Sequence, residues 1–380
     1  MIRLLKITGT VIGALVLALA LLLLYWRFRP NTAEVNPALG LEVWDAVNDG
    51  MHNSNTDMIF FKDHFYLVHA SSPYHFATPE CRLYVWRSKD AKKWEKLSTV
   101  RVPGEDIRDP KFLSMGGRLY MYVLKSVQFE AEPYKTAYVV SDDGIKWSAL
   151  TDMEPEGWLF WRPKTRDGKT WYIPAYWWEH NKSMLLMSTD GSRWKKVSDI
   201  YEGGRNDETA IEFLPDGTMI ATLRLEYSDS LFGDKRASTG IRVSRPPYTE
   251  WAGIEDKSTR LDGPALFSYN GRVYAIGRRH VGTPGLINYH GSIFTRKRTS
   301  LYLVTPERLV FLSDLPSAGD TTYAGYVKKG DTLYFSYYTS DPKRDFPWIM
   351  GMVLKSPILM ARLDLPSLEK LAIKKMRATK

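Results

Sequence analysis

The sequence predicts an all-β fold, a six-bladed β-propeller, preceded by one N-terminal transmembrane helix. Six hairpins with apolar arms recur along the chain, with turns near residues 63, 117, 168, 217, 271 and 330. The steps between these turns are 49 to 59 residues. An all-β repeat of about fifty residues is typical of a propeller, in which each repeat forms one four-stranded blade around a central channel. A separate apolar run near the N-terminus predicts the helix.

The hairpin at Asp207–Arg224 shows the repeated pattern most clearly. An apolar run at 210–214 is followed by Asp216-Gly217 and then by a second apolar run at 219–223. Asp-Gly between two β-rich runs is a strong hairpin signal, because the turn requires residues that tolerate positive φ. The other five hairpins turn at Lys62-Asp63, Gly116-Gly117, Asp167-Gly168, Asn270-Gly271 and Lys329-Gly330.

The N-terminal run at residues 7–26 contains no charged residue. Twenty helical residues span about 30 Å, the thickness of a bilayer core. Tyr25 and Trp26 end the run and Arg27 follows it, with no small-residue cleavage site there, which favours an uncleaved anchor over a signal peptide. Basic residues flank both ends of the run, so they set only a slight orientation bias.

We therefore expect four parts in the chain. Residues 1–29 form the membrane anchor, residues 30–44 a linker, residues 45–366 the propeller and residues 367–380 a basic C-terminal tail. The expected localisation is a membrane, with a single-pass N-terminal anchor and the propeller on the periplasmic or extracellular side.

The net charge of +9 does not indicate a nucleic-acid partner. Four basic residues among the first 30 and four among the last seven account for +8 of it, with no acid in either segment. The rest of the chain is close to neutral and has no broad basic footprint. The single cysteine, Cys81, excludes an internal disulfide framework.

A second repeat lies between the hairpins. The pattern S-x-D-G-x-x-W occurs at 141–147 and 188–194, with Ala for Gly at 88–94 and in decayed form at 244–251. Asp and Ser side chains can close such a turn on backbone N–H groups, and the Trp packs back onto the hairpin. We therefore expect structural roles for Asp90, Asp143 and Asp190.

These turns are similar to the Asp boxes, or BNR repeats, of the sialidase (neuraminidase) superfamily, and the resemblance covers roughly residues 45–365. The layout resembles most closely the uncharacterised bacterial sialidase-like proteins. Asp boxes lie on the blade periphery and recur in non-catalytic propellers, so they are evidence for the fold and not for an activity.

In a propeller the first strand of each blade lines the channel, and the heads of these strands converge at one mouth. We expect the site among the following residues at the strand heads: His52, Asn53, Asn55, Asp57, Arg108, Asp109, Trp161, Arg162, Asp207, Glu208, Asp262, Asp320, Thr322 and Tyr323. Five heads carry a carboxylate, which favours a shared polar pocket over the alternative that the acids only cap strand ends.

The resemblance implies a glycoside hydrolase with a tyrosine nucleophile, which is an exception to the rule of paired carboxylates. On this basis Tyr323 is the expected nucleophile, Glu208 its base, and Asp57 or Asp109 the acid/base. The expected substrate-binding residues are Arg108, Arg162, Arg224, Arg279 and Asp262; Arg278 is an alternative to Arg279. A neutral phenol suits an anionic sugar, so the expected ligand is an acidic glycan.

The sequence also departs from the sialidase pattern, and alternatives remain open. Blade one has Asn53–Asp57 where sialidases usually place an arginine. A non-catalytic glycan-binding propeller is one alternative, and a scaffold for protein partners is a weaker one. Arg108-Asp109 with Asp57 and Glu208 also resembles the three-carboxylate set of furanosidase and arabinanase propellers, although those have five blades.

We expect no metal and no cofactor. His52, His69 and His75 could meet Asp57 at the mouth, but their spacing matches no compact ligand motif. The expected partners are a glycan and, through the N-terminal helix, the membrane.

Overall fold

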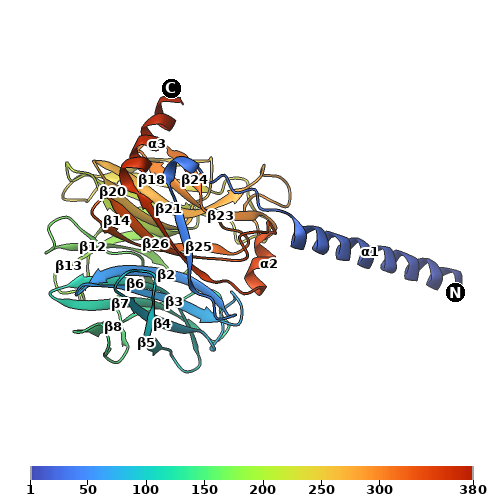
Figure 1. Cartoon of the computed structure of the whole chain (residues 1–380), viewed down its shortest axis with the longest axis horizontal. Helices are drawn as coiled ribbons and strands as arrows, with labels where there is room; N and C mark the ends of the chain where they lie inside the picture. The colour runs from blue at the N-terminus through green and yellow to red at the C-terminus, as the bar shows by residue number, and fades with distance from the viewer. Residues whose placement is uncertain (1, 379–380) are drawn as a thin grey trace.

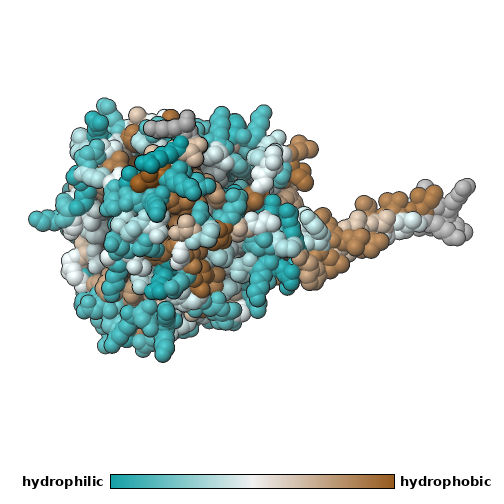
Figure 2. Space-filling model, turned by 45° about the horizontal axis from the view of Figure 1, so that its top comes forward, coloured by the Kyte–Doolittle hydropathy of each residue, from teal (hydrophilic) through white to brown (hydrophobic). Residues whose placement is uncertain are grey.

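The computed structural model describes residues 2–378 and confirms a six-bladed propeller preceded by one long apolar helix (Figure 1). That helix, α1 (Ile2–Phe28), projects from the propeller, and Figure 2 shows it as a brown arm on a largely teal body. Residues 7–28 are long and apolar enough to cross a membrane, and their most apolar window has no buried residue. A signal sequence would meet the same criteria.

The first three blades follow the order of the chain. Blade one contains β2 (His52–Phe61), β3 (His64–Ser72), β4 (Arg82–Ser88) and β5 (Glu95–Val100). Blade two contains β6 (Glu105–Met115), β7 (Arg118–Val127), β8 (Lys135–Ser141) and β9 (Thr151–Asp152). In blade three β10 (Trp158–Phe160) and β11 (Lys164–Thr165) share the innermost position beside β12 (Trp171–Trp177), followed by β13 (Lys182–Ser188) and β14 (Lys195–Glu202).

The last three blades complete the ring. Blade four contains β15 (Asn206–Phe213), β16 (Met219–Leu225), β18 (Ser238–Ser244) and β19 (Ala252–Asp256). Blade five contains β20 (Asp262–Tyr269), β21 (Arg272–Val281), β23 (Arg296–Val304) and β24 (Leu309–Asp314). Blade six contains β25 (Thr321–Lys329), β26 (Thr332–Thr339), β27 (Ile358–Asp364) and β1 (Glu42–Val47). The short pair β17 (Gly233–Asp234) and β22 (His290–Gly291) joins loops of blades four and five.

The N-terminal strand closes the ring. β1 pairs antiparallel with β27, with Trp44 opposite Met360, and becomes the outermost strand of blade six. The Trp44 indole N–H also donates to the Ala91 carbonyl of blade one at 3.0 Å. The expected linker therefore ends earlier than residue 44, because residues 42–44 already belong to the sheet.

The segment between α1 and β1 is also bound to the propeller. The Asn31 amide donates to the carbonyls of Ser317 and Pro342, at 2.9 and 2.8 Å. Further on, the Glu34 N–H donates to Asp314 at 2.9 Å, and the helical turn η1 (Pro37–Leu39) buries Leu39. We call residues 29–41 the strap, since they run along blades five and six and were expected only as a linker.

The Asp-box turns have the predicted geometry. Asp90 Oδ1 accepts the backbone N–H groups of Lys92 and Lys93, both at 2.9 Å, and Asp143 and Asp190 make the same contacts. The predicted turn at Asp167-Gly168 has the same geometry, with Thr165 in place of Ser: Asp167 accepts two backbone N–H groups at 2.8 Å. It closes the inner hairpin of blade three.

The C-terminal segment is a helix and not only a basic tail. α3 (Leu365–Ala378) packs on blades five and six through the buried side chains of Leu365, Leu368, Leu371 and Ala372. Its apolar residues recur at helical spacing, with the basic residues on the other positions. Residues 379 and 380 of the expected tail lie outside the described residues. One more helix, α2 (Trp348–Val353), lies in the long loop of blade six.

The packing of α3 leads to a stability prediction. Leu368→Ala removes a fully buried side chain, so we expect the free energy of unfolding to fall by about 2–5 kcal/mol, the usual range for core leucines. Lys370→Ala, on the exposed face of the same helix, is the control and should stay within about 0.5 kcal/mol of the unmodified protein. Denaturant unfolding of both variants measures the difference, and equal effects would contradict the packing.

Candidate functional site

A cavity of about 370 Å³ lies at the mouth of the channel, where the inner-strand heads of blades one, two, four and six meet the second strands of blades three and five. Every blade contributes to its lining: Asn55, Asp109, Tyr176, Glu208, Arg278 and Tyr323 come from blades one to six in that order. Loops that join the second and third strand form the upper wall in every blade except blade three.

β-Bulges direct these side chains into the cavity. In five blades the register of the innermost strand shifts just after its head, between 54 and 57, 108 and 111, 206 and 209, 262 and 265, and 322 and 325. At four of them a residue in the bulge has a left-handed backbone: Asn55 (φ 49°), Asp109 (φ 52°), Gly263 (φ 58°) and Tyr323 (φ 42°). Bulges re-aim side chains in this way, and they cluster near functional sites.

The centre of the cavity is a tyrosine–glutamate pair. The Tyr323 hydroxyl donates a hydrogen bond to Glu208 Oε1. Glu208 Oε2 accepts the Gly263 N–H at 2.7 Å and lies 3.1 Å from Arg224 Nη1. Burial raises the pKa of Glu208 above its usual value and the pKa of Tyr323 well above its own. The phenol is therefore neutral at rest and already points its proton at a carboxylate.

Arginines surround this pair. The Arg278 guanidinium carbon lies 5.3 Å from the ring centre of Tyr323 and 4.6 Å from that of Trp348. Arg224, Arg108, Arg205 and Arg260 also line the cavity. Because a guanidinium can pair with a carboxylate through two hydrogen bonds, such a group can orient an anionic ligand.

Buried carboxylates form ion pairs with these arginines on the side away from the cavity. Arg224 Nε lies 2.8 and 3.0 Å from the two oxygens of Asp207, and Arg108 lies 2.6 and 2.7 Å from Asp106. Arg278 lies between Asp262 at 3.2 Å and Asp320 at 3.3 Å. All four aspartates are fully buried. Asp262 therefore positions arginines and is not part of the cavity lining, contrary to the expectation of a substrate contact.

The charges of the lining balance. It contains five arginines and five carboxylates, the latter being Asp109, Glu132, Glu208, Glu226 and Asp229. The cavity is therefore a mixed polar pocket, with as many carboxylates as arginines. Its positive charge is concentrated beside Tyr323, where Arg224 and Arg278 lie.

The structure places two expected site residues beneath the cavity. Asp57 is fully buried, pairs with Arg162 and accepts the Phe112 N–H at 2.7 Å. Arg162 also donates to the Ala324 carbonyl at 2.8 Å. This pair crosslinks four blades around the channel, and neither residue lines the cavity. Of the two acid/base candidates, only Asp109 faces it, where the Asn55 amide holds it.

Arg279 also lies away from the cavity. It pairs with Asp314 through two contacts of 2.7 Å and with Glu34 of the strap at 3.1 Å. Successive side chains of a strand point to opposite faces, so Arg278 faces the site and Arg279 faces outward. The sequence had left these two arginines as alternatives, and the structure corrects the preference for Arg279.

Several lining residues were not predicted. Two of them, Arg205 and Arg260, lie just before strand heads. The others follow the second strands of their blades: Glu132, Glu226 and Trp348. Arg260 stands only two residues before Asp262 and binds it at 2.7 and 3.0 Å. Arg205 and Arg260 each stand two residues before a strand-head acid, Asp207 and Asp262, and this spacing is visible in the sequence.

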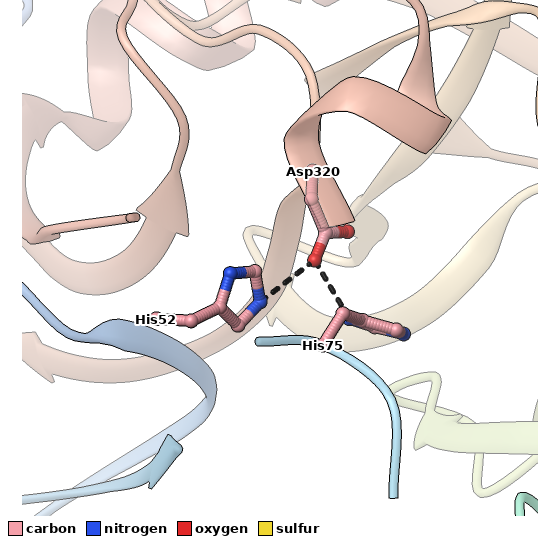
Figure 3. Close-up of side chains that lie close together, drawn as sticks. All are labelled: His52, His75 and Asp320. Carbon is pink, nitrogen blue, oxygen red and sulfur yellow. Dashed lines mark ion pairs between the residues drawn. The ribbon is translucent and has the colours of Figure 1, made fainter. Parts of the chain in front are cut away.

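Figure 3 shows His52 and His75 pointing at one oxygen of Asp320, at 3.1 and 2.7 Å. The other ring nitrogen of His52, Nδ1, lies 2.7 Å from the Leu354 carbonyl, so both ring nitrogens face acceptor oxygens. The three residues could offer a metal two nitrogens and an oxygen, but Arg278, 3.3 Å from the other oxygen, disfavours a cation there. We assign them to positioning Asp320 and, through it, Arg278. His69 lies apart, bonded to Trp86.

A second cluster surrounds His180, which lies 3.0 Å from Glu132, 3.2 Å from Glu226 and 3.5 Å from Asp207. Burial alone would lower the pKa of His180, but these carboxylates raise it to about 10. The imidazolium has no lone pair for a metal, so this cluster is an ionic network. It ties the blade-two loop at Glu132 to blades three and four.

This leads to a protonation prediction. We expect His180 to remain an imidazolium at about pH 8, since its pKa is raised from about 6.5 to about 10. Its contribution to stability is complete below about pH 6.5 and is lost as the pH rises towards 10. Side-chain ¹H–¹⁵N spectra measure this directly. His69, whose pKa burial lowers to about 4, is the neutral control; a neutral His180 signal at this pH would contradict the prediction.

Several solved structures are similar to this chain in fold. A crystal structure of a protein of unknown function from Dyadobacter fermentans is similar over 85% of this chain and 99% of its own, with 15% identity and a TM-score of 0.60. Trypanosoma rangeli sialidase in complex with sialic acid is similar over 90% of this chain, with 11% identity and a TM-score of 0.63. The endosialidase of phage phi92 is similar over 86%, with 10% identity and a TM-score of 0.63.

The match covers 61% of the trypanosome chain and 69% of the phage chain. No protein-family model matches this chain, and no curated protein is similar to it in sequence. At identities of 10 to 15% the likeness is one of fold. The chain therefore has the six-bladed propeller fold of the sialidases.

Proposed function

We propose that this protein is a membrane-anchored exo-glycosidase that cleaves acidic glycans with retention of configuration. The observation that carries the proposal is the hydrogen bond from Tyr323 to Glu208 at the centre of the mouth cavity, flanked by Arg224 and Arg278. A phenol that donates to a buried carboxylate is a nucleophile beside its base. The sialidase-like fold supports a glycoside hydrolase in general.

The proposed reaction has two steps. In the first, Tyr323 Oη attacks the anomeric carbon and passes its proton to Glu208, while Asp109 protonates the departing glycosidic oxygen. In the second, Asp109 takes a proton from water, which attacks the same carbon. Tyr323 leaves and recovers its proton from Glu208. Two inversions retain the configuration.

An acidic sugar fits the charges beside the nucleophile. Arg224 and Arg278 line the cavity, whereas their partners Asp207, Asp262 and Asp320 are fully buried behind them. A carboxylate on the sugar would face the two guanidinium groups. A neutral phenol can approach such a sugar without the repulsion that a carboxylate nucleophile would meet.

A non-catalytic glycan-binding propeller is the second candidate. It is favoured by the balanced charge of the lining and by Asn55 at the blade-one position where sialidases usually have an arginine. The carboxylate-based, furanosidase-like alternative has less support, because Asp57 lies beneath the cavity and not in it.

The location of the protein is part of the proposal. We propose that α1 stays attached as a single-pass anchor and that the propeller lies on the periplasmic or extracellular side. Full-length protein should then sediment with membranes after high-salt washing.

The mechanism predicts the effect of two conservative substitutions. Tyr323→Phe removes the nucleophilic oxygen and Glu208→Gln its base, so each should reduce turnover of an aryl α-sialoside by at least about a hundredfold. Tyr334→Phe, near the hairpin turn of β26 at the end opposite the cavity, is the matched control and should retain activity. Product configuration is followed by NMR. Binding without turnover by the unmodified protein would support the glycan-binding alternative.

The charge preference predicts a second contrast. Arg224→Lys keeps the charge but loses the planar fork, so binding of an acidic oligosaccharide should weaken by about 1–3 kcal/mol. Arg279→Lys makes the same change on the outward face and should leave binding unchanged. Titration calorimetry with acidic and neutral oligosaccharides measures both. Equal or tighter binding of the neutral set would rule out the preference for acidic glycans.

A further inference from the structure

Exposed apolar side chains gather at one end of the propeller. Beyond α1, the described chain exposes thirteen large apolar side chains, and ten of them lie at the end that carries the cavity mouth. The loop between the second and third strand of every blade contributes at least one. One from each blade, in order, gives Phe76, Phe129, Trp178, Leu231, Leu286 and Val353. We call these six residues the apolar rim.

The opposite end of the propeller exposes few apolar side chains. Its inner-hairpin turns consist of Gly, Asp, Asn and Lys residues, and Ile145 is the one strongly exposed apolar side chain in the described turns there. Scattered exposed apolar residues are ordinary on a soluble protein, but a ring confined to one end marks an interaction surface.

The helix α1 leaves the propeller at the same end. The Arg344 side chain, in the mouth loop of blade six, donates to the Phe28 carbonyl at 3.3 Å, and the Asp345 N–H donates to the Arg29 carbonyl at 2.9 Å. Trp26 and Arg29 line a small cavity together with Phe294 of the blade-five loop. Figure 2 shows further brown side chains on the body where the brown helix begins.

The strap keeps the helix at this end. Thr32 donates to Asp345 at 3.0 Å, Glu34 bonds to Asp314, and Asn36 donates to Ser313 at 2.9 Å. Bound residues cannot act as a flexible tether. A membrane that holds α1 therefore lies next to the apolar rim and not next to the other end of the propeller.

The cavity itself changes character with depth. Tyr323, Glu208 and the arginines form its floor, whereas Phe76, Leu231, Ile293 and Met352 belong to its upper wall. An amphiphilic substrate fits such a site, with a polar, charged group at the floor and an apolar group at the opening. Basic side chains on the same loops, among them Lys235, Lys343 and Lys355, suit anionic headgroups.

We propose that the apolar rim rests in the interface of the bilayer that holds α1, and that the substrate is a glycolipid of that bilayer. This inference rests on the proposed function and on the anchor. The cavity takes the acidic sugar headgroup while the lipid stays in the membrane. Hydrolysis breaks the bond between the anomeric carbon and the glycosidic oxygen. The lipid keeps that oxygen and gains a proton from Asp109, and water supplies the hydroxyl of the released sugar.

Labelling at single positions tests where the rim lies. The only native cysteine, Cys81, is buried, so Leu286→Cys, Phe129→Cys and Ile145→Cys each offer one reactive thiol in the full-length chain. Each is labelled with an environment-sensitive dye and reconstituted into vesicles of phosphatidylcholine and phosphatidylglycerol. Spin-labelled lipids should quench the dye at 286 and 129 severalfold more than at 145, which is at the opposite end. Equal quenching at all three positions, or none, would overturn the proposal, as would full-length protein that does not float with the vesicles.

A paired activity assay tests the substrate. Leu286→Asp and Phe129→Asp place charge on the rim without touching the cavity lining. Turnover of a vesicle-embedded acidic glycolipid should fall at least about tenfold. Turnover of a soluble aryl glycoside of the same sugar should be unchanged, and Ile145→Asp should affect neither. An unchanged rate on the glycolipid would overturn the proposal. If the unmodified protein cleaves neither substrate, the proposed function fails, and the labelling result still decides where the rim lies.

Discussion

The mouth of this propeller depends on carboxylates that are buried behind arginines. Asp106, Asp207, Asp262 and Asp320 have no solvent exposure, and each touches an arginine that lines the cavity. A buried charge is costly unless it is paired and hydrogen-bonded, so neither partner of such a pair can be lost alone without a large penalty. The consequence is a set of guanidinium groups held at fixed positions. Asp320 extends the arrangement by accepting from Tyr338 at 3.1 Å and from Trp348 at 2.7 Å.

The same burial sets the chemistry of the central pair. Removing Glu208 and Tyr323 from water disfavours the charged form of each, which raises both pKa values. Arg224 and Arg278 act in the opposite direction by favouring the anions. The two effects therefore oppose each other in setting the position of the proton between the Tyr323 hydroxyl and Glu208. A negatively charged ligand beside Arg224 and Arg278 would reduce the stabilisation that these arginines give to the anions of Glu208 and Tyr323. The phenol would then stay neutral until the reaction begins.

The repeats in the sequence predicted the fold well, because its signals are local. The residues that form each turn and each Asp box lie within about ten positions of one another in the sequence. The structure has the six turns and the boxes at the predicted positions. The strap and β1 were missed because their partners lie about 280 to 320 residues away, in blades five and six. A short run such as 42–47 has no local signal that it closes a ring. α3 is a different case, because its helical periodicity is local and the segment was interpreted from its basic residues alone.

The site was predicted in part, and the β-bulges explain the limit. A pattern of strand heads places Glu208, Tyr323 and Asp109 at the mouth, and the structure brings all three to one cavity. The pattern cannot distinguish Asp57 from Asp109, because a bulge changes which residues of a strand face the channel. It also cannot distinguish Arg278 from Arg279 until the register of β21 is known.

Chain topology links the site to the helix that precedes it. The first strand after the strap, β1, is the outer strand of blade six and runs towards the mouth before the chain enters β2. The strap must therefore cover the length of blades five and six in the opposite direction, from the mouth to the start of β1. Its contacts to Asp314, Ser317 and Asp345 follow that path. Because the strap starts at the mouth, α1 and the cavity are at the same end for a reason of connectivity, independent of the apolar rim. The two features point to the same surface from separate causes, and a substrate that enters the cavity must approach past the base of the helix.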